Sequence, residues 1–147
     1  MYIGFLLGER GKKAYREFFR ILAEHDPEKG AVLWHCDDGK DRAGIAAMLL
    51  LYALGADRAV IIDDYLLTNE SNAQKIETAK QKYSGKGMSE SKLKAMIFVS
   101  GGVFAEYLDN AIDTLTRKYG SVTGYIREEL GFSDSDIILL QEKYTRV

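Results

Sequence analysis

The sequence has little of what disulfide-rich and metal-binding proteins are built from. Its 147 residues include one cysteine and two histidines. A single cysteine excludes an internal disulfide framework and suits a reducing compartment, so a cytoplasmic location is expected, with export left open if a native N-terminus precedes Met1. No group of histidine, cysteine and aspartate has metal-ligand spacing, and His25 is expected to be a polar residue at a helix end.

An excess of charge of one sign and long apolar runs are also absent. The chain carries 20 Lys and Arg residues against 22 Asp and Glu residues, a formal net charge of −2. This balance gives no general attraction to nucleic acid or to an anionic membrane, so no nucleic-acid partner is expected. No apolar stretch approaches the roughly 20 residues of a membrane span, and no secretory signal opens the chain, so stable membrane insertion is not expected.

What is present is ordinary for one soluble globular domain. Hydrophobic residues make up 46% of the chain and charged residues 29%. The sequence shows no internal repeats and no low-complexity tracts, and its length allows a sizeable core. Residues 1–147 are therefore predicted to form a single domain.

The most informative segment is His35–Gly44, which reads H-C-D-D-G-K-D-R-A-G. It follows the apolar run Ala31–Trp34 and precedes the apolar stretch Ile45–Leu54, which predicts a strand, a tight loop and a helix. Such a loop turns its backbone N–H groups inward, and the helix N-terminus adds its own, so a phosphate dianion can sit at the centre. The loop residues predicted to bind phosphate are Asp37, Asp38, Gly39, Lys40, Asp41, Arg42 and Ala43, with His35 and Gly44 in support.

Cys36 and Arg42 carry the chemistry predicted for this loop. The field that holds phosphate also favours a thiolate, so the pKa of Cys36 is expected to fall by a few units from about 8.5. Arg42 can place two N–H groups on two phosphoryl oxygens. The alternative is that Cys36 is an inert buried thiol, which its spacing from Arg42, the loop glycine Gly39 and the strand-to-helix context argue against.

The loop resembles that of cysteine-dependent protein tyrosine phosphatases, in particular the bacterial tyrosine and phosphoinositide phosphatases whose loop reads H-C-x-x-G-K-D-R-T-G. The segment Asp64–Asn69, D-Y-L-L-T-N, is similar to their D-Y-L-x-S/T-N segment, and Lys118–Val122 and Leu130–Asp134 are similar to their closing helices. The resemblance runs from about Tyr15 to the C-terminus. It implies the C-terminal portion of a tyrosine phosphatase-like domain whose N-terminal half is absent.

The resemblance also implies roles for three neighbours of the cysteine. Lys40 would contact additional phosphates on a polyanionic head group, the alternative being a solvated lysine. Asp41 is a candidate general acid or water-positioning group, or else pairs with Arg42 or a backbone N–H and only shapes the loop. His35 is expected to hydrogen-bond the loop backbone and orient Cys36 rather than to transfer protons.

Two features depart from the family. Ala43 stands where the family has a hydroxyl residue that donates to the cysteine sulfur, and the loss of such a donor is expected to slow phosphocysteine hydrolysis about tenfold to a hundredfold. Asp37 and Asp38 place two carboxylates at the mouth of the loop. They would repel an incoming dianion over about 8–10 Å unless their side chains point outward.

The rest of the chain is predicted to be mostly helical. Apolar stripes at helical spacing and glycines at helix ends support this; they are Tyr15, Phe18, Phe19 and Leu22, then Phe104, Leu108, Ala111 and Leu115, with Gly55, Gly120 and Gly131. Asp63 and Asp64, adjacent on a predicted helix, cannot both face the loop, and at least one is expected on the helix surface. The polar stretch Tyr83–Ser91 is predicted to be a surface loop, or else a hinge for a lid helix over the phosphate loop.

Only Ala31–Trp34 has the pattern of a buried strand, and one strand cannot make a sheet. Met1–Leu7 is either a second strand or a helix. The predicted fold class is therefore α/β, tyrosine phosphatase-like, with a central strand, loop and helix and an incomplete sheet. Met1–Leu7, a second copy in a homo-oligomer, or a complementing N-terminal chain would complete it.

These observations predict a phosphatase that hydrolyses phosphomonoesters, in a phosphorylated protein or a phosphoinositide, through a phosphocysteine intermediate. Cys36 attacks phosphorus, Arg42 and the loop N–H groups stabilise the phosphoryl oxygens, and Asp41 or an aspartate outside this chain protonates the leaving oxygen. No metal and no cofactor are expected. The alternatives are a catalytically impaired pseudophosphatase that binds phosphate or phosphoprotein or that needs a partner chain for activity, and a regulatory or assembly subunit.

Overall fold

The computed structural model describes residues 1–145, and residues 146 and 147 of the predicted domain lie outside the described residues. Helices account for most of the described chain, as the sequence predicts. They are α1 (Tyr2–Leu7), α2 (Glu9–Glu24), the 3-10 turn η1 (Pro27–Lys29), α3 (Arg42–Ala53), α4 (Arg58–Leu66), α5 (Thr68–Ser71), α6 (Ala73–Tyr83), α7 (Glu90–Val99), α8 (Ala105–Tyr119), α9 (Val122–Glu128) and α10 (Asp134–Tyr144).

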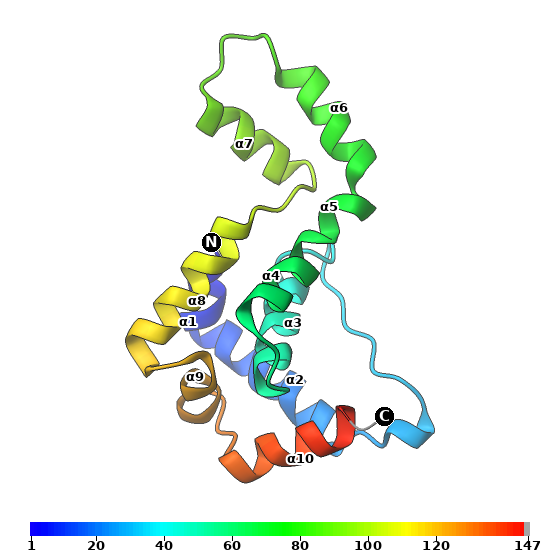
Figure 1. The fold of residues 1–147 in the computed structure, drawn as a ribbon, viewed down its shortest axis with the longest axis vertical. Coiled ribbons are helices and arrows are strands. Elements are labelled where there is room, and N and C mark those ends of the chain that lie inside the picture. Colours follow the sequence, from blue (N-terminus) through cyan, green and yellow to red (C-terminus); the bar gives the residue numbers. More distant parts are fainter. Residues whose placement is uncertain (146–147) are drawn as a thin grey trace.

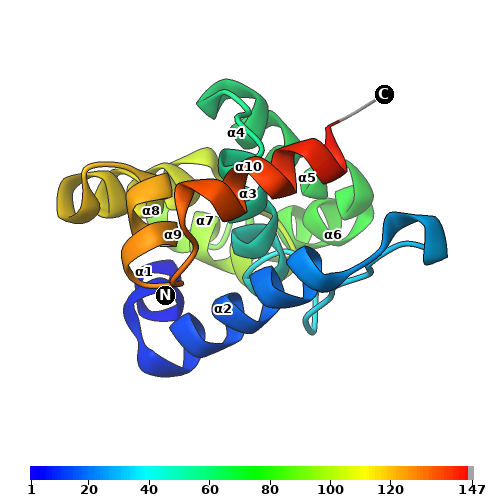
Figure 2. The same ribbon diagram turned by 90° about the horizontal axis from the view of Figure 1, so that it is seen from below.

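The central helix is α3, which follows the predicted phosphate loop. It is apolar on nearly every side, the pattern of a helix that has neighbours all around it. It contacts α1, α2, α4, α9 and α10, and Ile45, Met48 and Leu49 are almost completely buried. Figures 1 and 2 show these helices grouped about α3. The loop is thus carried by the helix that the rest of the core holds in place.

The two predicted amphipathic helices are confirmed. In α2 the buried side chains are Tyr15, Phe19 and Leu22, and Phe18 packs against the same core. In α8 they are Leu108, Ala111, Ile112 and Leu115, with Phe104 just before the helix. Gly120 ends α8 in the left-handed conformation, with φ 75°, which a residue with a side chain adopts at a cost.

The predicted strand at Ala31–Trp34 is wrong for this chain. No segment within residues 1–145 forms a β-strand, and Leu33 is 89% exposed. Figure 1 shows the segment between η1 and α3 following an open path beside the helices. A strand needs a neighbouring strand for its backbone hydrogen bonds. Because the regular elements within residues 1–145 are all helical, the apolar run has no strand to pair with.

The alternative that Met1–Leu7 is a second strand is also wrong. Tyr2–Leu7 forms the helix α1, in which Tyr2 and Leu6 are buried. The side chains of α1 pack against the core, and its backbone groups are used within the helix and at its junction with α2. Met1–Leu7 therefore cannot complete a sheet with Ala31–Trp34.

Helices α6 and α7 form a hairpin that projects from the other helices (Figure 1). The polar stretch Tyr83–Ser91 makes its turn and is largely exposed, which confirms the surface-loop prediction. Side-chain amides join the two ends of the hairpin at its base, where it meets the body. Asn69 donates to the carbonyl of Val103 at 3.0 Å and accepts from its N–H at 2.8 Å, and Asn72 donates to the carbonyl of Gly101 at 3.0 Å. The hinge hypothesis for the turn stays a prediction.

Within residues 1–145, no helix combines the length and the apolar character that crossing a membrane requires.

Candidate active site

The predicted phosphate loop curls around the sulfur of Cys36. Backbone N–H groups hydrogen-bond this sulfur from four positions, Ala43, Gly39, Arg42 and Asp41. Gly39 has φ 70°, the left-handed conformation that turns the loop back toward α3. N–H groups that converge in this way, at the N-terminus of a long helix, form a site for an anion.

The surroundings of Cys36 favour its thiolate. Partial burial by itself raises the pKa of the thiol, but the backbone N–H groups outweigh it, and the pKa lies below its ordinary value. Tyr15 of α2 lies close enough to Cys36 for the charge of the sulfur to affect the pKa of the Tyr15 hydroxyl. Its pKa is raised by burial and further by the Cys36 charge. The predicted direction of the Cys36 pKa is thus the direction that the loop geometry gives.

Arg42 is paired within the loop. Its Nη2 donates to Oδ2 of Asp37 at 2.6 Å, and both side chains reach solvent. Asp38 is exposed as well. The two carboxylates therefore point outward rather than into the curl of the loop. The Asp37 carboxylate nevertheless binds the guanidinium group with which a phosphoryl group would pair, so Asp37 competes with an anion for Arg42.

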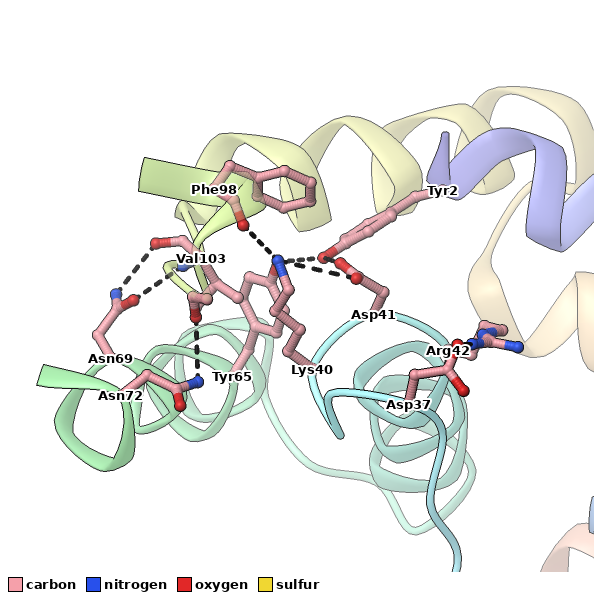
Figure 3. A network of polar contacts seen from close by, with 11 residues as sticks. Tyr2, Asp37, Lys40, Asp41, Arg42, Tyr65, Asn69, Asn72, Phe98 and Val103 are labelled. Atoms are coloured by element: carbon pink, nitrogen blue, oxygen red, sulfur yellow. Dashed lines mark hydrogen bonds and ion pairs between the residues drawn. The ribbon is translucent and has the colours of Figure 1, made fainter. Parts of the chain in front are cut away.

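Lys40 lies on the opposite side of the loop from Arg42 (Figure 3). Its side chain is 3% exposed, so the solvated-lysine alternative is wrong. Its Nζ donates to the backbone carbonyl of Phe98 near the end of α7 and lies 3.9 Å from the centre of the Phe98 ring. In this arrangement the ammonium group is directed at α7.

Asp41 is turned the same way as Lys40. Its Oδ1 accepts a hydrogen bond from the hydroxyl of Tyr2 at 2.8 Å, and its Oδ2 lies 3.8 Å from Nζ of Lys40. The alternative that Asp41 pairs with Arg42 or a backbone N–H is wrong, because its carboxylate oxygens contact Tyr2 and Lys40 and it makes no side-chain cap hydrogen bond to α3. The carboxylate of Asp41 thus sits behind the loop, where Tyr2 and Lys40 hold it.

Sequence reasoning assigned no role to Tyr2 and Tyr65. Their hydroxyl oxygens lie 2.5 Å apart, and the rings meet edge to face. Tyr65 belongs to the D-Y-L-L-T-N segment that resembles the family, so the sequence drew attention to its position but did not reveal Tyr2 as its partner. It also explains Gly44, because a Cβ there would lie 3.3 Å from the Tyr65 ring. For Tyr2, 39 residues from Asp41, no sequence signal exists.

Aromatic and imidazole groups brace both ends of the loop. Trp34 donates through Nε1 to the carbonyl of Ala43 at 3.3 Å, and the Tyr15 hydroxyl donates to the carbonyl of Arg42 at 3.4 Å. Nδ1 of His35 lies 3.3 Å from the carbonyl oxygen of Cys36, the backbone contact expected of it. Ala43 is buried and offers the sulfur only its backbone N–H.

The remaining candidates lie away from the loop. Asp63 and Asp64 are both exposed on α4, so the helix-surface interpretation is confirmed for both. His25 follows the last residue of α2, and its Nε2 lies 3.1 Å from the carbonyl oxygen of Gly30. It is therefore the polar helix-end residue that was predicted.

A curled loop that surrounds a thiol and ends in an arginine at a helix N-terminus has the geometry that suits an anion beside a nucleophile. Comparison with known proteins then identifies the family of the chain. The sequence profile of the tyrosine phosphatase family matches residues 1–146. The chain belongs to the tyrosine phosphatase family.

Individual relatives agree with this. The triple specificity protein phosphatase PtpB of Mycobacterium tuberculosis is 39% identical over 124 residues, which cover 80% of this chain and 44% of that protein. A Cupriavidus necator protein whose name assigns it provisionally to the tyrosine-protein phosphatases is 35% identical over 130 residues, 88% of this chain and 45% of that protein. A tyrosine-protein phosphatase of Nostoc commune is 31% identical over 132 residues, 89% of this chain and 44% of its own length. The chain thus spans less than half the length of these relatives.

Proposed function

We propose that this chain carries the phosphoryl-transfer site of a phosphatase that hydrolyses phosphomonoesters through a phosphocysteine intermediate. The observation that carries the proposal is the convergence of four backbone N–H groups on the Cys36 sulfur, which lowers the pKa of the thiol. Membership of the tyrosine phosphatase family supports it. A thiolate is the nucleophilic form of cysteine, and the same N–H groups suit the oxygens of a phosphoryl group.

In the first step the Cys36 sulfur attacks phosphorus in line with the leaving oxygen. A sulfur–phosphorus bond forms, the phosphorus–oxygen bond breaks, and the leaving oxygen takes a proton. The loop N–H groups and Arg42 stabilise the three equatorial oxygens. Arg42 must exchange Asp37 for the phosphoryl group, which is feasible because an exposed ion pair is worth only about 0–1 kcal/mol.

The proton for the leaving oxygen comes from Asp41 or from a carboxyl group outside this chain. Asp41 is the candidate that belongs to the loop, and its backbone N–H faces the sulfur. Its carboxylate is held by Tyr2 and Lys40, so an acid role requires that it leaves the Tyr2 hydroxyl. A carboxyl group brought in from outside requires no such movement.

In the second step water attacks the phosphocysteine and the thiolate leaves. The Ala43 side chain cannot donate to the departing sulfur, which leaves the backbone N–H groups to stabilise it. We therefore expect hydrolysis of the intermediate to limit turnover.

The substrates we propose are phosphotyrosine in proteins and phosphoinositides. One relative carries triple specificity in its name, and the side chains of Asp37 and Arg42 reach solvent. A panel of an aryl phosphate, phosphotyrosine, phosphoserine and phosphothreonine peptides and a phosphoinositide would rank these substrates by kcat/KM.

Hydrolysis of para-nitrophenyl phosphate tests the proposal. We expect turnover that Cys36→Ser abolishes and that Arg42→Lys lowers by about a hundredfold or more, because a lysine cannot bind two phosphoryl oxygens in one plane. Turnover that survives Cys36→Ser would refute the phosphocysteine mechanism. Binding of inorganic phosphate to the wild-type chain with no turnover of any substrate would favour the phosphate-binding pseudophosphatase instead.

A further inference from the structure

A pair of buried tyrosines stands directly behind the phosphate loop. Tyr2 of α1 is 5% exposed and Tyr65 of α4 is 4% exposed. Their hydroxyl oxygens lie 2.5 Å apart, and the Tyr2 hydroxyl lies 2.8 Å from Oδ1 of Asp41. Three groups from three separate parts of the chain therefore form one hydrogen-bonded row, which runs from the two buried tyrosines to the partly buried Asp41 of the loop (Figure 3).

Counting protons gives the row a direction. A carboxylate only accepts hydrogen bonds, so the single hydroxyl proton of Tyr2 goes to Asp41. Tyr65 must then donate its own proton to the Tyr2 oxygen. Burial raises the pKa of both hydroxyls above the ordinary tyrosine value, so both protons stay in place at neutral pH. The row is thus a donor chain aimed at Asp41.

Lys40 is anchored on the same side of the loop. Its buried ammonium group donates to the Phe98 carbonyl and lies 3.8 Å from Oδ2 of Asp41. Two consecutive loop side chains are therefore drawn to the back by α1, α4 and α7. The backbone on their other side is the part that faces Cys36, because the N–H groups of Asp41 and Arg42 hydrogen-bond its sulfur.

We propose that Tyr2 and Tyr65 are positioning residues for the phosphate loop. Their hydroxyls hold the Asp41 side chain behind the loop, and this keeps the N–H groups of Asp41 and Arg42 aimed at the sulfur and at a bound phosphoryl group. Asp41 is the link through which they act, and neither tyrosine touches the reacting atoms. The phosphoryl part of this inference rests on the proposed function; the effect on the Cys36 thiol does not.

The chain offers a matched control for an ordinary buried tyrosine. Tyr125 is fully buried, and its hydroxyl donates to the carbonyl of Leu6 at 2.7 Å. Removing that hydroxyl costs the core a buried tyrosine hydrogen bond, here to a neutral carbonyl of α1, and leaves Asp41 and the loop untouched. A purely structural role for Tyr2 would make the two variants behave alike.

The experiment measures the rate of iodoacetamide alkylation of Cys36 against pH, with thermal unfolding recorded for each variant. The charged and titratable groups near the thiol, Arg42 with its partner Asp37, Tyr15 and His35, are the same in every variant. We expect Tyr2→Phe to raise the pKa of Cys36 by about half a unit to one unit, which slows alkylation below the pKa about threefold to tenfold. Tyr65→Phe shifts it in the same direction by less, since its hydroxyl acts through Tyr2.

Tyr125→Phe is expected to lower the unfolding temperature and to leave the pKa of Cys36 at its wild-type value. A Tyr2→Phe protein that is folded but titrates like wild type overturns the proposal, as does a Tyr125→Phe protein that shifts as far as Tyr2→Phe. If Tyr2→Phe does not fold, Tyr65→Phe decides, and an unchanged pKa there counts against the proposal. Because alkylation needs no turnover, an inactive wild-type chain would count against the proposed function and leave this result intact.

Discussion

At the scale of single residues, the phosphate loop has a front and a back. Asp37 and Arg42 meet at the front, in solvent, while Lys40 and Asp41 are held at the back by Tyr2 and α7. With the Lys40 and Asp41 side chains at the back, the backbone N–H groups of Asp41 and Arg42 face the sulfur. The side chain that can bind an anion, Arg42, therefore differs from the side chains that fix the loop, Lys40 and Asp41, although all three are adjacent in sequence.

The ion pair between Asp37 and Arg42 leads to a prediction about anion affinity. Asp37→Ala frees the guanidinium group, so we expect inorganic phosphate to inhibit alkylation of Cys36 at about twofold to fivefold lower concentration, as an exposed ion pair would allow. Asp38→Ala is the control, because it removes the same charge from the neighbouring exposed position. Equal gains in the two variants would show that general repulsion matters and the pairing does not.

Ala43 leads to a prediction about the step that limits turnover. Ala43→Thr restores a hydroxyl beside the sulfur and should raise steady-state hydrolysis of para-nitrophenyl phosphate about tenfold or more, while the initial burst rate barely changes. Ala43→Val has the same shape without the hydroxyl and should give no gain. Stopped-flow measurement of both phases checks this, and a burst that accelerates as much as the steady state would instead indicate a general repair of the loop.

Residue chemistry could be predicted where it is local. A curled loop is predicted by the spacing of Cys36 and Arg42 and by the glycine Gly39, because the backbone conformation there depends on neighbours in sequence. The partners of Lys40 and Asp41 could not be predicted in this way. They are Phe98 and Tyr2, 58 and 39 residues away, and no periodicity connects them.

At the scale of elements, Lys40 ties the phosphate loop to α7. Replacing it with methionine removes the bond to the Phe98 carbonyl and keeps an apolar side chain over the ring. We expect the amides of α7 to exchange with deuterium about threefold to tenfold faster in Lys40→Met. Lys86→Met, in the exposed turn of the hairpin, is the control and should leave exchange in α7 unchanged.

Unchanged exchange in α7 of Lys40→Met would mean that the hairpin is held by its other contacts alone. Those contacts include the bond from Asn72 to Gly101 and the ion pair between Lys94 and Glu106.

Helices were the predictable elements of this fold, because the spacing of apolar residues in the sequence shows the buried faces of α2 and α8. The strand at Ala31–Trp34 was not, because a strand is completed by partners and the chain supplies none within residues 1–145.

At the scale of the whole molecule, the segment Ala31–Trp34 packs Val32 and Trp34 against the core but has no strand to pair with its backbone within residues 1–145. Leu33 is 89% exposed, and the chain covers less than half of its relatives. We propose that the segment pairs with strands of a complementing N-terminal chain or of a second copy. Pairing would supply the backbone hydrogen bonds that a strand requires.

Hydrogen exchange together with light scattering tests this assembly. In dilute monomer the amides of residues 31–34 should exchange within seconds, and they should become protected in a dimer or after addition of an N-terminal half. Exchange in α3, which is buried in either state, serves as the internal reference. A folded monomer that gains no protection at residues 31–34 under any of these conditions would contradict the proposal.

The central claim is that Cys36 carries the phosphoryl group, and mass spectrometry of an acid-quenched reaction tests it most directly. The chain is mixed with para-nitrophenyl phosphate, quenched within the burst, and digested for peptide mapping. The account predicts one added phosphoryl group on the peptide that contains Cys36. Its level should be higher in the wild-type chain than in Ala43→Thr, because the wild-type chain hydrolyses the phosphocysteine more slowly. Release of para-nitrophenol with no phosphoryl group on that peptide would contradict it.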